Sequence, residues 1–396
     1  MRIDPIKRAE ELRRTLLEQR VQVVDFSDTL QGKDTSRVID LMPNIATGEF
    51  VFRTKVNVKA IDPVAAGEYK TDFFDVSLKS DVEIEEFIRR GEFDFPLWFK
   101  HNPDFSMKNV LDYNTPFIMQ VGGCNFHDGS STGGCWYCFV DDKSNDGLRG
   151  NGKVSLSASE AIESMLNARE KIKDTYSKLG KDVNIRVMRT SGGEPTIVLD
   201  WILGLWRQIG ERGLDFVGQL DSNLSTGTVV DDFERRGVYE PHILEKLAKY
   251  PVKVLTALKG TDEENLQSNV QSTTTMEAQE YSIKKFLKAG FDIYPQMYNP
   301  NPKTLGRFLV DMDSKIENFS LRVHIGPLKL YGPNKKRLEC EAISRRVEPQ
   351  VFIAQKKKEW DESYSPSVEV IDKYLREAHG VGYKDVTRSD VQLRIK

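Results

Sequence analysis

Between positions 117 and 325 the hydrophobic residues fall into short apolar runs, separated by segments in which apolar residues recur at helical spacing. Short apolar runs bounded by Gly, Pro or polar residues are typical of buried strands. Strands are predicted over residues 117–121, 185–190, 214–220, 252–258, 292–297 and 321–325. Because strands that alternate with helices form parallel βα units, the pattern predicts an α/β fold of six units. Such units build either a doubly wound sheet or a barrel-like arc, and both place ligands at the carboxyl ends of the strands.

Local signals mark the helices that lie between these strands. Residues 157–160 form a capping box, in which a serine and a glutamate satisfy each other's backbone N–H groups at the start of a helix. The apolar stripe that follows consists of Ala161, Met165, Ala168 and Ile172. Further helices are predicted from Trp201 to Gly213, from Pro241 through Leu247, over residues 281–289, and from Thr304 through Met312.

The chain on either side of the six units has a different pattern. Residues 1–112 are predicted to form an α+β extension, with a charged helix at 10–20, a half-buried strand at 49–60, a helix at 80–91 and an aromatic stretch at 93–105. Residues 113–332 form the predicted partial barrel. Residues 333–396 are predicted to form a C-terminal helical extension.

Composition and charge narrow the class of protein. The hydrophobic fraction of 39% is enough for a packed core, and the net charge of −3 gives no global basic field of the kind that attracts nucleic acid. No apolar run approaches the ~18 residues of a membrane span, and the first residues lack the apolar core of a secretory signal. We therefore expect a cytoplasmic protein with reduced thiols and no membrane partner. Two basic clusters, at 335–337 and 356–358, are expected to be solvated faces or to steer an acidic substrate such as RNA or an acidic protein.

Three of the four cysteines lie close together, directly after the first predicted strand. Ten residues separate Cys124 from Cys135, two separate Cys135 from Cys138, and the intervening loop is rich in Gly and Ser. Cysteines clustered in this way in an otherwise Cys-poor chain are typical of metal ligands rather than of disulfides. Cys340 stands alone and is predicted to be an idle thiol, whereas Trp136 and Phe139 are predicted to be packing residues.

Polar residues and glycines also follow the other predicted strands. Gly192, Gly193 and Glu194 follow the second strand, and the two glycines would let the backbone approach a ligand closely while Glu194 receives an ammonium group. The residues that complete the set are Ser222 and Asn223 after the third strand, Lys259 after the fourth, Gln296 at the fifth, and His324 and Ile325 on the sixth. Such a ring of polar strand ends is typical of a shared ligand pocket.

The combination resembles the radical S-adenosylmethionine (SAM) superfamily. The matching residues are Cys124, Cys135 and Cys138 after the first strand, Gly192-Gly193-Glu194-Pro195 after the second, and Tyr137 as the aromatic residue before the last cysteine. The resemblance covers about residues 116 to 330 and implies a partial (β/α)6 barrel. The family's usual spacing is three residues between the first two cysteines and two between the last two. The first gap is longer here, so the resemblance does not identify the subfamily.

The resemblance also implies the cofactors and their ligands. The three cysteines would hold a [4Fe-4S] cluster whose fourth iron binds SAM. Roles in SAM binding would fall to Tyr137, Gly192, Gly193, Glu194, Ser222, Asn223, Lys259, Gln296, His324 and the backbone near Ile325. An electron from a flavodoxin- or ferredoxin-type donor would cleave SAM to a 5′-deoxyadenosyl radical that takes a hydrogen from the substrate. Leu258-Lys259-Gly260 is similar to a segment of glycyl-radical-enzyme activases, which favours a macromolecular substrate, protein or RNA, over a small molecule.

One alternative uses the same loop differently. Cys124 and His127, followed by Cys135 and Cys138, are four potential tetrahedral zinc ligands in two knuckles. The alternative function is therefore a zinc-stabilised binding protein on an α/β scaffold. It leaves the Gly-Gly-Glu-Pro segment and the βα repeat without an explanation.

Overall fold

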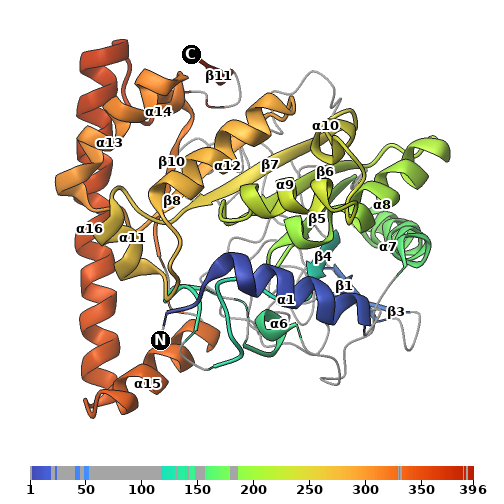
Figure 1. The fold of residues 1–396 in the computed structure, drawn as a ribbon, viewed down its shortest axis with the longest axis horizontal. Helices are drawn as coiled ribbons and strands as arrows, with labels where there is room; N and C mark the ends of the chain where they lie inside the picture. Colours follow the sequence, from blue (N-terminus) through green and yellow to red (C-terminus); the bar gives the residue numbers. More distant parts are fainter. Residues whose placement is uncertain are drawn as a thin grey trace.

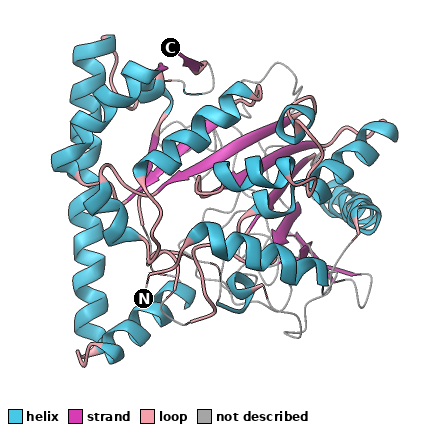
Figure 2. Ribbon diagram, in the orientation of Figure 1, coloured by secondary structure: helices cyan, strands magenta, loops and turns pink. Residues whose placement is uncertain are grey.

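The structure, a computed structural model, describes residues 2–18, 23–24, 41–44, 49–52, 117–130, 133–138, 140, 142–147, 157–178, 186–328, 330, 332–386, 388 and 391–396. A parallel sheet runs through the centre of these residues, and helices cover it (Figures 1 and 2). The predicted helix at 80–91 and the aromatic stretch at 93–105 lie outside the described residues.

Six parallel strands lie side by side in the order in which they occur along the chain. They are β4 (Phe117–Val121), β5 (Val187–Ser191), β6 (Val217–Ser222), β7 (Val252–Leu258), β8 (Ile293–Tyr298) and β10 (His324–Gly326). Every neighbouring pair is parallel, from β4 and β5 to β8 and β10. This sequential parallel order is that of a partial barrel, so the predicted α/β fold is confirmed.

The prediction for the sixth strand was partly wrong. Residues 319–322 form the short helix α14 (Phe319–Arg322), and the strand begins only at His324. Asn318 adopts a left-handed conformation before this helix, and the Arg322 side chain is fully buried. Its guanidinium donates to the Ile293 carbonyl over 3.0 Å and pairs with Asp292 over 2.6 Å. A buried guanidinium needs such partners, and the helical turn aims it at them.

The main helices of the barrel pack against the sheet. They are α7 (Ala158–Lys178), the 3-10 helix η4 (Pro195–Val198), α8 (Leu199–Glu211), α9 (Gly227–Arg235), α10 (Ile243–Leu247), α12 (Met276–Lys288) and α13 (Pro302–Lys315). The short helix α11 (Glu263–Asn269) packs instead against the cysteine loop. Close packing is clearest at Gly218 of β6, where an added Cβ would lie 2.2 Å from the Trp206 ring of α8. A glycine there lets a large aromatic ring fill the space between helix and sheet.

The capping signals had mixed outcomes. The predicted capping box of α7 is confirmed, because Ser157 N donates to Glu160 Oε2 over 2.7 Å and Glu160 N donates to Ser157 Oγ over 3.2 Å. The helix predicted from Thr304 instead begins at Pro302, and its cap is Asn301, whose side chain accepts from Lys303 N. Proline suits the first helical position because its missing N–H is not needed there.

Near the amino terminus, α1 (Pro5–Glu18) lies against α9 and η4, and an ion pair of 2.6 Å joins Arg13 to Asp200. The strands β1 (Val23–Val24), β2 (Leu41–Asn44) and β3 (Glu49–Phe52) extend the sheet beyond β4. The remainder of the strand predicted at 49–60 lies outside the described residues.

The C-terminal segment is largely helical. It comprises α15 (Gly332–Ser344), α16 (Pro349–His379) and the short strand β11 (Arg394–Ile395), which pairs with β9 (Ile316–Glu317). The long helix α16 runs along one side of the molecule, next to α13 and α15 (Figure 1). None of the helices in the described part of the chain has the combined length and apolarity that crossing a bilayer requires.

Candidate cofactor site

A cavity opens at the carboxyl ends of the parallel strands. It holds about 1060 Å³ of empty space, part of it open to solvent. The predicted site residues that line it are Cys124, Cys135, Tyr137, Cys138, Gly192, Gly193, Glu194, Ser222, Asn223, Lys259 and Gln296. Residues far apart in the sequence therefore converge on one space.

The two glycines after β5 serve a contact between two turns. Gly192 and Gly193 have φ angles of +64° and +59°, a region that favours glycine. An added Cβ at Gly193 would lie 2.0 Å from the Gly123 carbonyl oxygen. Glu194 N also donates to that oxygen over 2.9 Å. The backbone of the cysteine loop therefore leaves no room for a side chain at Gly193. From the sequence, the glycine was instead predicted to allow close approach to a ligand.

Hydrogen bonds to Glu194 connect the end of β5 to the end of β6. Its buried carboxylate accepts from Thr196 Oγ1 over 2.7 Å, from Ser222 Oγ over 3.1 Å and from Asn223 N over 2.7 Å. Burial raises the pKa of this carboxyl, although the hydrogen bonds from Asn223 and Thr196 act to lower it. The glutamate therefore positions Ser222 and Asn223 as well as facing the cavity.

The three cysteine thiols lie close enough to influence one another. Burial raises the pKa of Cys124, and the charges of Cys135 and Cys138 raise it further. Burial also raises the pKa of Cys135, against the opposing effect of the Lys259 ammonium. A raised pKa favours the protonated thiol, and the positive charge of a bound metal centre would favour the thiolate instead.

Tyr137 adds a second indication of a missing partner. Its ring packs beside that of Tyr298, with centroids 5.9 Å apart, and its side chain is buried. Its hydroxyl finds no hydrogen-bond partner within the described part of the chain. Since buried hydroxyls are normally paired, the orphaned group indicates that a ligand or water belongs beside it. The three thiols and this hydroxyl together fit a cavity built for a metal cluster and a polar cofactor.

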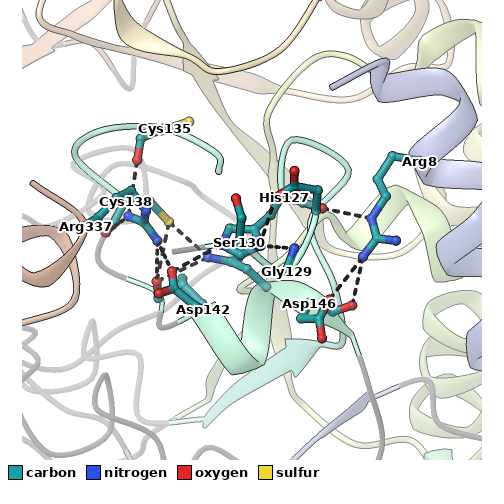
Figure 3. A network of polar contacts seen from close by, with 12 residues as sticks. Arg8, His127, Gly129, Ser130, Cys135, Cys138, Asp142, Asp146 and Arg337 are labelled. Atoms are coloured by element: carbon teal, nitrogen blue, oxygen red, sulfur yellow. Dashed lines mark hydrogen bonds and ion pairs between the residues drawn. The ribbon is translucent and has the colours of Figure 1, made fainter. Parts of the chain in front are cut away.

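The cysteine loop is held in place by an arginine from the C-terminal extension (Figure 3). Arg337 of α15 is fully buried and donates to the carbonyls of Cys135 and Cys138 over 3.3 and 3.0 Å. It also pairs over 2.8 Å with Asp142, the first residue of α6 (Asp142–Asp146). Arg337 was expected on a solvated basic face. Lys335 and Lys336 are exposed, but Arg337 points inward because it lies on the opposite side of the helix.

His127 belongs to the same network, and its geometry opposes the zinc alternative. Its Nδ1 accepts from Gly129 N over 2.9 Å, so the proton of the neutral ring is on Nε2, which lies 3.2 Å from Asp142 Oδ1. Both ring nitrogens are occupied and neither is free to bind a metal. Within the described residues, no group of three or more His, Cys, Asp or Glu side chains is arranged to hold a single metal ion.

Two predicted site residues do not line the cavity. His324 is the first residue of β10, and its ring stacks on that of Tyr294, with ring centroids 6.4 Å apart. Ile325 is buried on the outer face, and its backbone N–H donates to Tyr383 Oη over 2.8 Å. That N–H is therefore already used and is not available for an adenine ring.

Other residues line the cavity without having been predicted. Arg189 of β5 pairs with Asp221 of β6, with Nε 2.6 Å from Oδ2, and both face the cavity. Asn145 of α6 is buried beside Cys138. Strand alternation offered a signal for Asp221, which lies two residues before the predicted site residue Asn223. Alternation gave no such signal for Arg189, which lies three residues before Gly192. No local pattern pointed to Asn145.

Comparison with known proteins gives only distant structural similarity. No protein-family model matches the chain, and no curated protein matches it. Matching solved structures include OxsB, a cobalamin-dependent S-adenosylmethionine radical enzyme, with 10% identity, a TM-score of 0.36, and coverage of 79% of this chain and 44% of OxsB. They also include anSMEcpe with bound AdoMet, with 16% identity, a TM-score of 0.33 and 57% coverage of each chain. The chain thus spans less than half of OxsB, and no residue role transfers at this level of similarity.

Proposed function

We propose that this chain is a radical SAM enzyme. Cys124, Cys135 and Cys138 would hold a [4Fe-4S] cluster, and SAM would bind between the cluster and the turn that carries Glu194. The proposed reaction is reductive cleavage of SAM followed by hydrogen abstraction from a substrate. When bound, a cluster held by three thiolates keeps one iron free of protein ligands, and that iron supplies the binding point and the electron for SAM.

The observation that carries the proposal is the convergence of three thiols and the Gly-Gly-Glu turn on one cavity. The thiols belong to the loop after β4 and the turn follows β5, and the two backbones touch through Glu194 N and Gly123 O at 2.9 Å. A tetrahedral zinc site would not explain that turn. A cofactor that binds the metal centre and also donates N–H groups to a carboxylate would use both the thiols and the turn.

The residues around the cavity have distinct proposed tasks. Among the described residues, Glu194 Oε2 accepts only from Asn223 N, so it retains acceptor capacity for an ammonium group. The orphaned Tyr137 hydroxyl is available to a polar atom of the same ligand. Leu255, Ala257 and Leu328 line the cavity with apolar groups, which would keep water from the reacting atoms.

The proposal includes two partners outside this chain. A flavodoxin- or ferredoxin-type protein would donate the electron. The substrate is proposed to be a macromolecule, protein or RNA. It would enter the cavity beside the Arg189–Asp221 pair, where a guanidinium and a carboxylate face the open space.

Anaerobic reconstitution with iron and sulfide tests the proposal. The protein is expected to turn brown with absorbance near 400 nm, and to form 5′-deoxyadenosine from SAM when a reductant is present. Cys138→Ala is expected to lose the cluster and the product. Cys340→Ala is the matched control, because Cys340 does not line the cavity, and it is expected to keep both. A colourless zinc protein that leaves SAM intact would refute the proposal.

A further inference from the structure

Two of the three cysteine sulfurs in the cavity accept a hydrogen bond from a side-chain amide. Asn145 Nδ2 lies 3.6 Å from Cys138 Sγ, and Asn223 Nδ2 lies 3.9 Å from Cys124 Sγ. Lys259 lines the same cavity as Cys135 and places an ammonium beside Tyr137, two residues along the chain from that cysteine. The two amides and the ammonium come from three different elements: α6, the turn after β6 and the turn after β7. Donor groups and a cation from separate parts of the chain therefore surround the three sulfurs.

Lys259 is the charged member of this shell, and its position is tightly set. The residue is 7% exposed, its N–H donates to Gln279 Oε1 over 3.2 Å, and its carbonyl accepts from Asn269 Nδ2 over 2.8 Å. The ammonium lies 5.4 Å from the centroid of the Tyr137 ring. A cation over an aromatic face and beside a buried sulfur is held there with little water to screen it.

Asn145 is the neutral member that can be varied most cleanly. It is 2% exposed, and its amide also donates to the Val140 carbonyl over 3.2 Å. The backbone carbonyl of Asn145 accepts from Cys124 N over 2.7 Å. Because an amide has two N–H groups, both are used, and one is aimed at the Cys138 sulfur. Asn223 makes a similar contact but also lies where SAM is proposed to bind.

We propose that the two amide donors and the Lys259 ammonium raise the reduction potential of the bound cluster, with Lys259 making the largest contribution. The inference rests on the proposed function, since it concerns the cluster that the three cysteines would hold. One electron added to a cluster increases the negative charge on its thiolate sulfurs. Hydrogen bonds and a nearby cation favour that reduced form, most strongly where the site is buried.

A redox titration followed by electron paramagnetic resonance, without SAM, measures this directly. Lys259→Met is expected to lower the ratio of reduced to oxidised cluster about tenfold at a given potential, which is ~59 mV for a one-electron couple. Lys259→Gln, which keeps an N–H but not the charge, is expected to fall between Lys259→Met and wild type. Lys259→Arg is expected to restore the wild-type potential within about twofold, and Asn145→Leu to lower the ratio about threefold.

Lys336→Met is the matched control, because this lysine is exposed on α15 and its charge is screened by solvent. It is expected to leave the potential unchanged. Iron content separates this inference from the proposed function: a wild-type protein that holds no iron overturns both. A loaded cluster whose potential is the same in wild type, Lys259→Gln and Asn145→Leu overturns this inference alone. These two variants also decide the question if Lys259→Met fails to retain iron.

Discussion

The cysteine loop is anchored to two different parts of the molecule. Val121, at the end of the strand that leads into the loop, belongs to the main core between the sheet and its helices, together with Leu12 of α1. Phe126, Cys135 and Tyr137 belong to a second core, which α11, α15 and α16 complete. The start of the loop is therefore joined to the barrel core, and the loop itself packs with the C-terminal extension.

The polar contacts differ between the two halves of the loop: the Cys124 side contacts the barrel and α1, whereas the Cys135–Cys138 side contacts α15. On the Cys124 side, Gly123 touches the turn at Gly193, and Arg8 of α1 donates to the His127 carbonyl over 2.8 Å. On the Cys135–Cys138 side, the backbone carbonyls rely on Arg337 (Figure 3). The comparison teaches that three neighbouring cysteines are brought to one cavity by two scaffolds, the barrel and the C-terminal extension, which meet at the loop. A substitution can be aimed at the contacts of either scaffold.

The largest expected effect comes from the barrel half. Gly193→Val places a branched side chain against the Gly123 carbonyl at a φ angle of +59°, so both overlap and backbone strain oppose folding. The free energy of unfolding is expected to fall by about 4 kcal/mol or more, measured by urea denaturation. Gly204→Ala in α8 is the control, because nothing lies within 4 Å of its added Cβ, and it is expected to stabilise by about 0.5–1 kcal/mol. Equal urea midpoints for the two variants would contradict the described docking of the turns.

The extension half is tested by Arg337→Met. The substitution removes the donors to two loop carbonyls and leaves Asp142 without its buried guanidinium partner, at a cost of about 3 kcal/mol. Iron content after reconstitution is expected to fall, while the main core stays folded, as measured by the helical circular dichroism signal. Arg337→Lys is expected to recover only part of the loss, because an ammonium cannot reach both carbonyls and the carboxylate. Full iron content in Arg337→Met would show that the second scaffold is dispensable.

A smaller effect sharpens the comparison through pH. Burial acts to raise the pKa of Asp142, but the hydrogen bond from His127 and the charge of Arg337 hold it below its usual value. A lowered pKa in the folded state stabilises the protein above the unfolded pKa of 3.8, and this contribution is lost as pH falls below that value. Asp142→Asn is therefore expected to lose about 2 kcal/mol at pH 7 and progressively less below pH 4, in urea denaturation at each pH. A difference from wild type that is constant between pH 7 and pH 3 would contradict this account.

Much of the barrel could be predicted because its signals are local. Apolar runs identified the six strands, and the cysteines and the Gly-Gly-Glu segment pointed to the strand ends that form the cavity. Predictions were wrong where a distant contact decided the outcome. The helical turn that buries Arg322 makes the sixth strand begin later than predicted, at His324, and the burial of Arg337 brings one residue of a basic cluster to the cysteine loop. No spacing along the chain carries that information, since Arg337 lies 199 positions from Cys138.

The central claim is that the two scaffolds bring three sulfurs to one iron–sulfur cluster beside the turn that holds Glu194. The most direct measurement is electron paramagnetic resonance of the reconstituted, reduced protein with and without SAM. The account predicts a [4Fe-4S] signal that SAM changes, that Cys138→Ala abolishes and that Cys340→Ala retains. A signal that does not respond to SAM, or a protein that binds zinc and no iron, would contradict it.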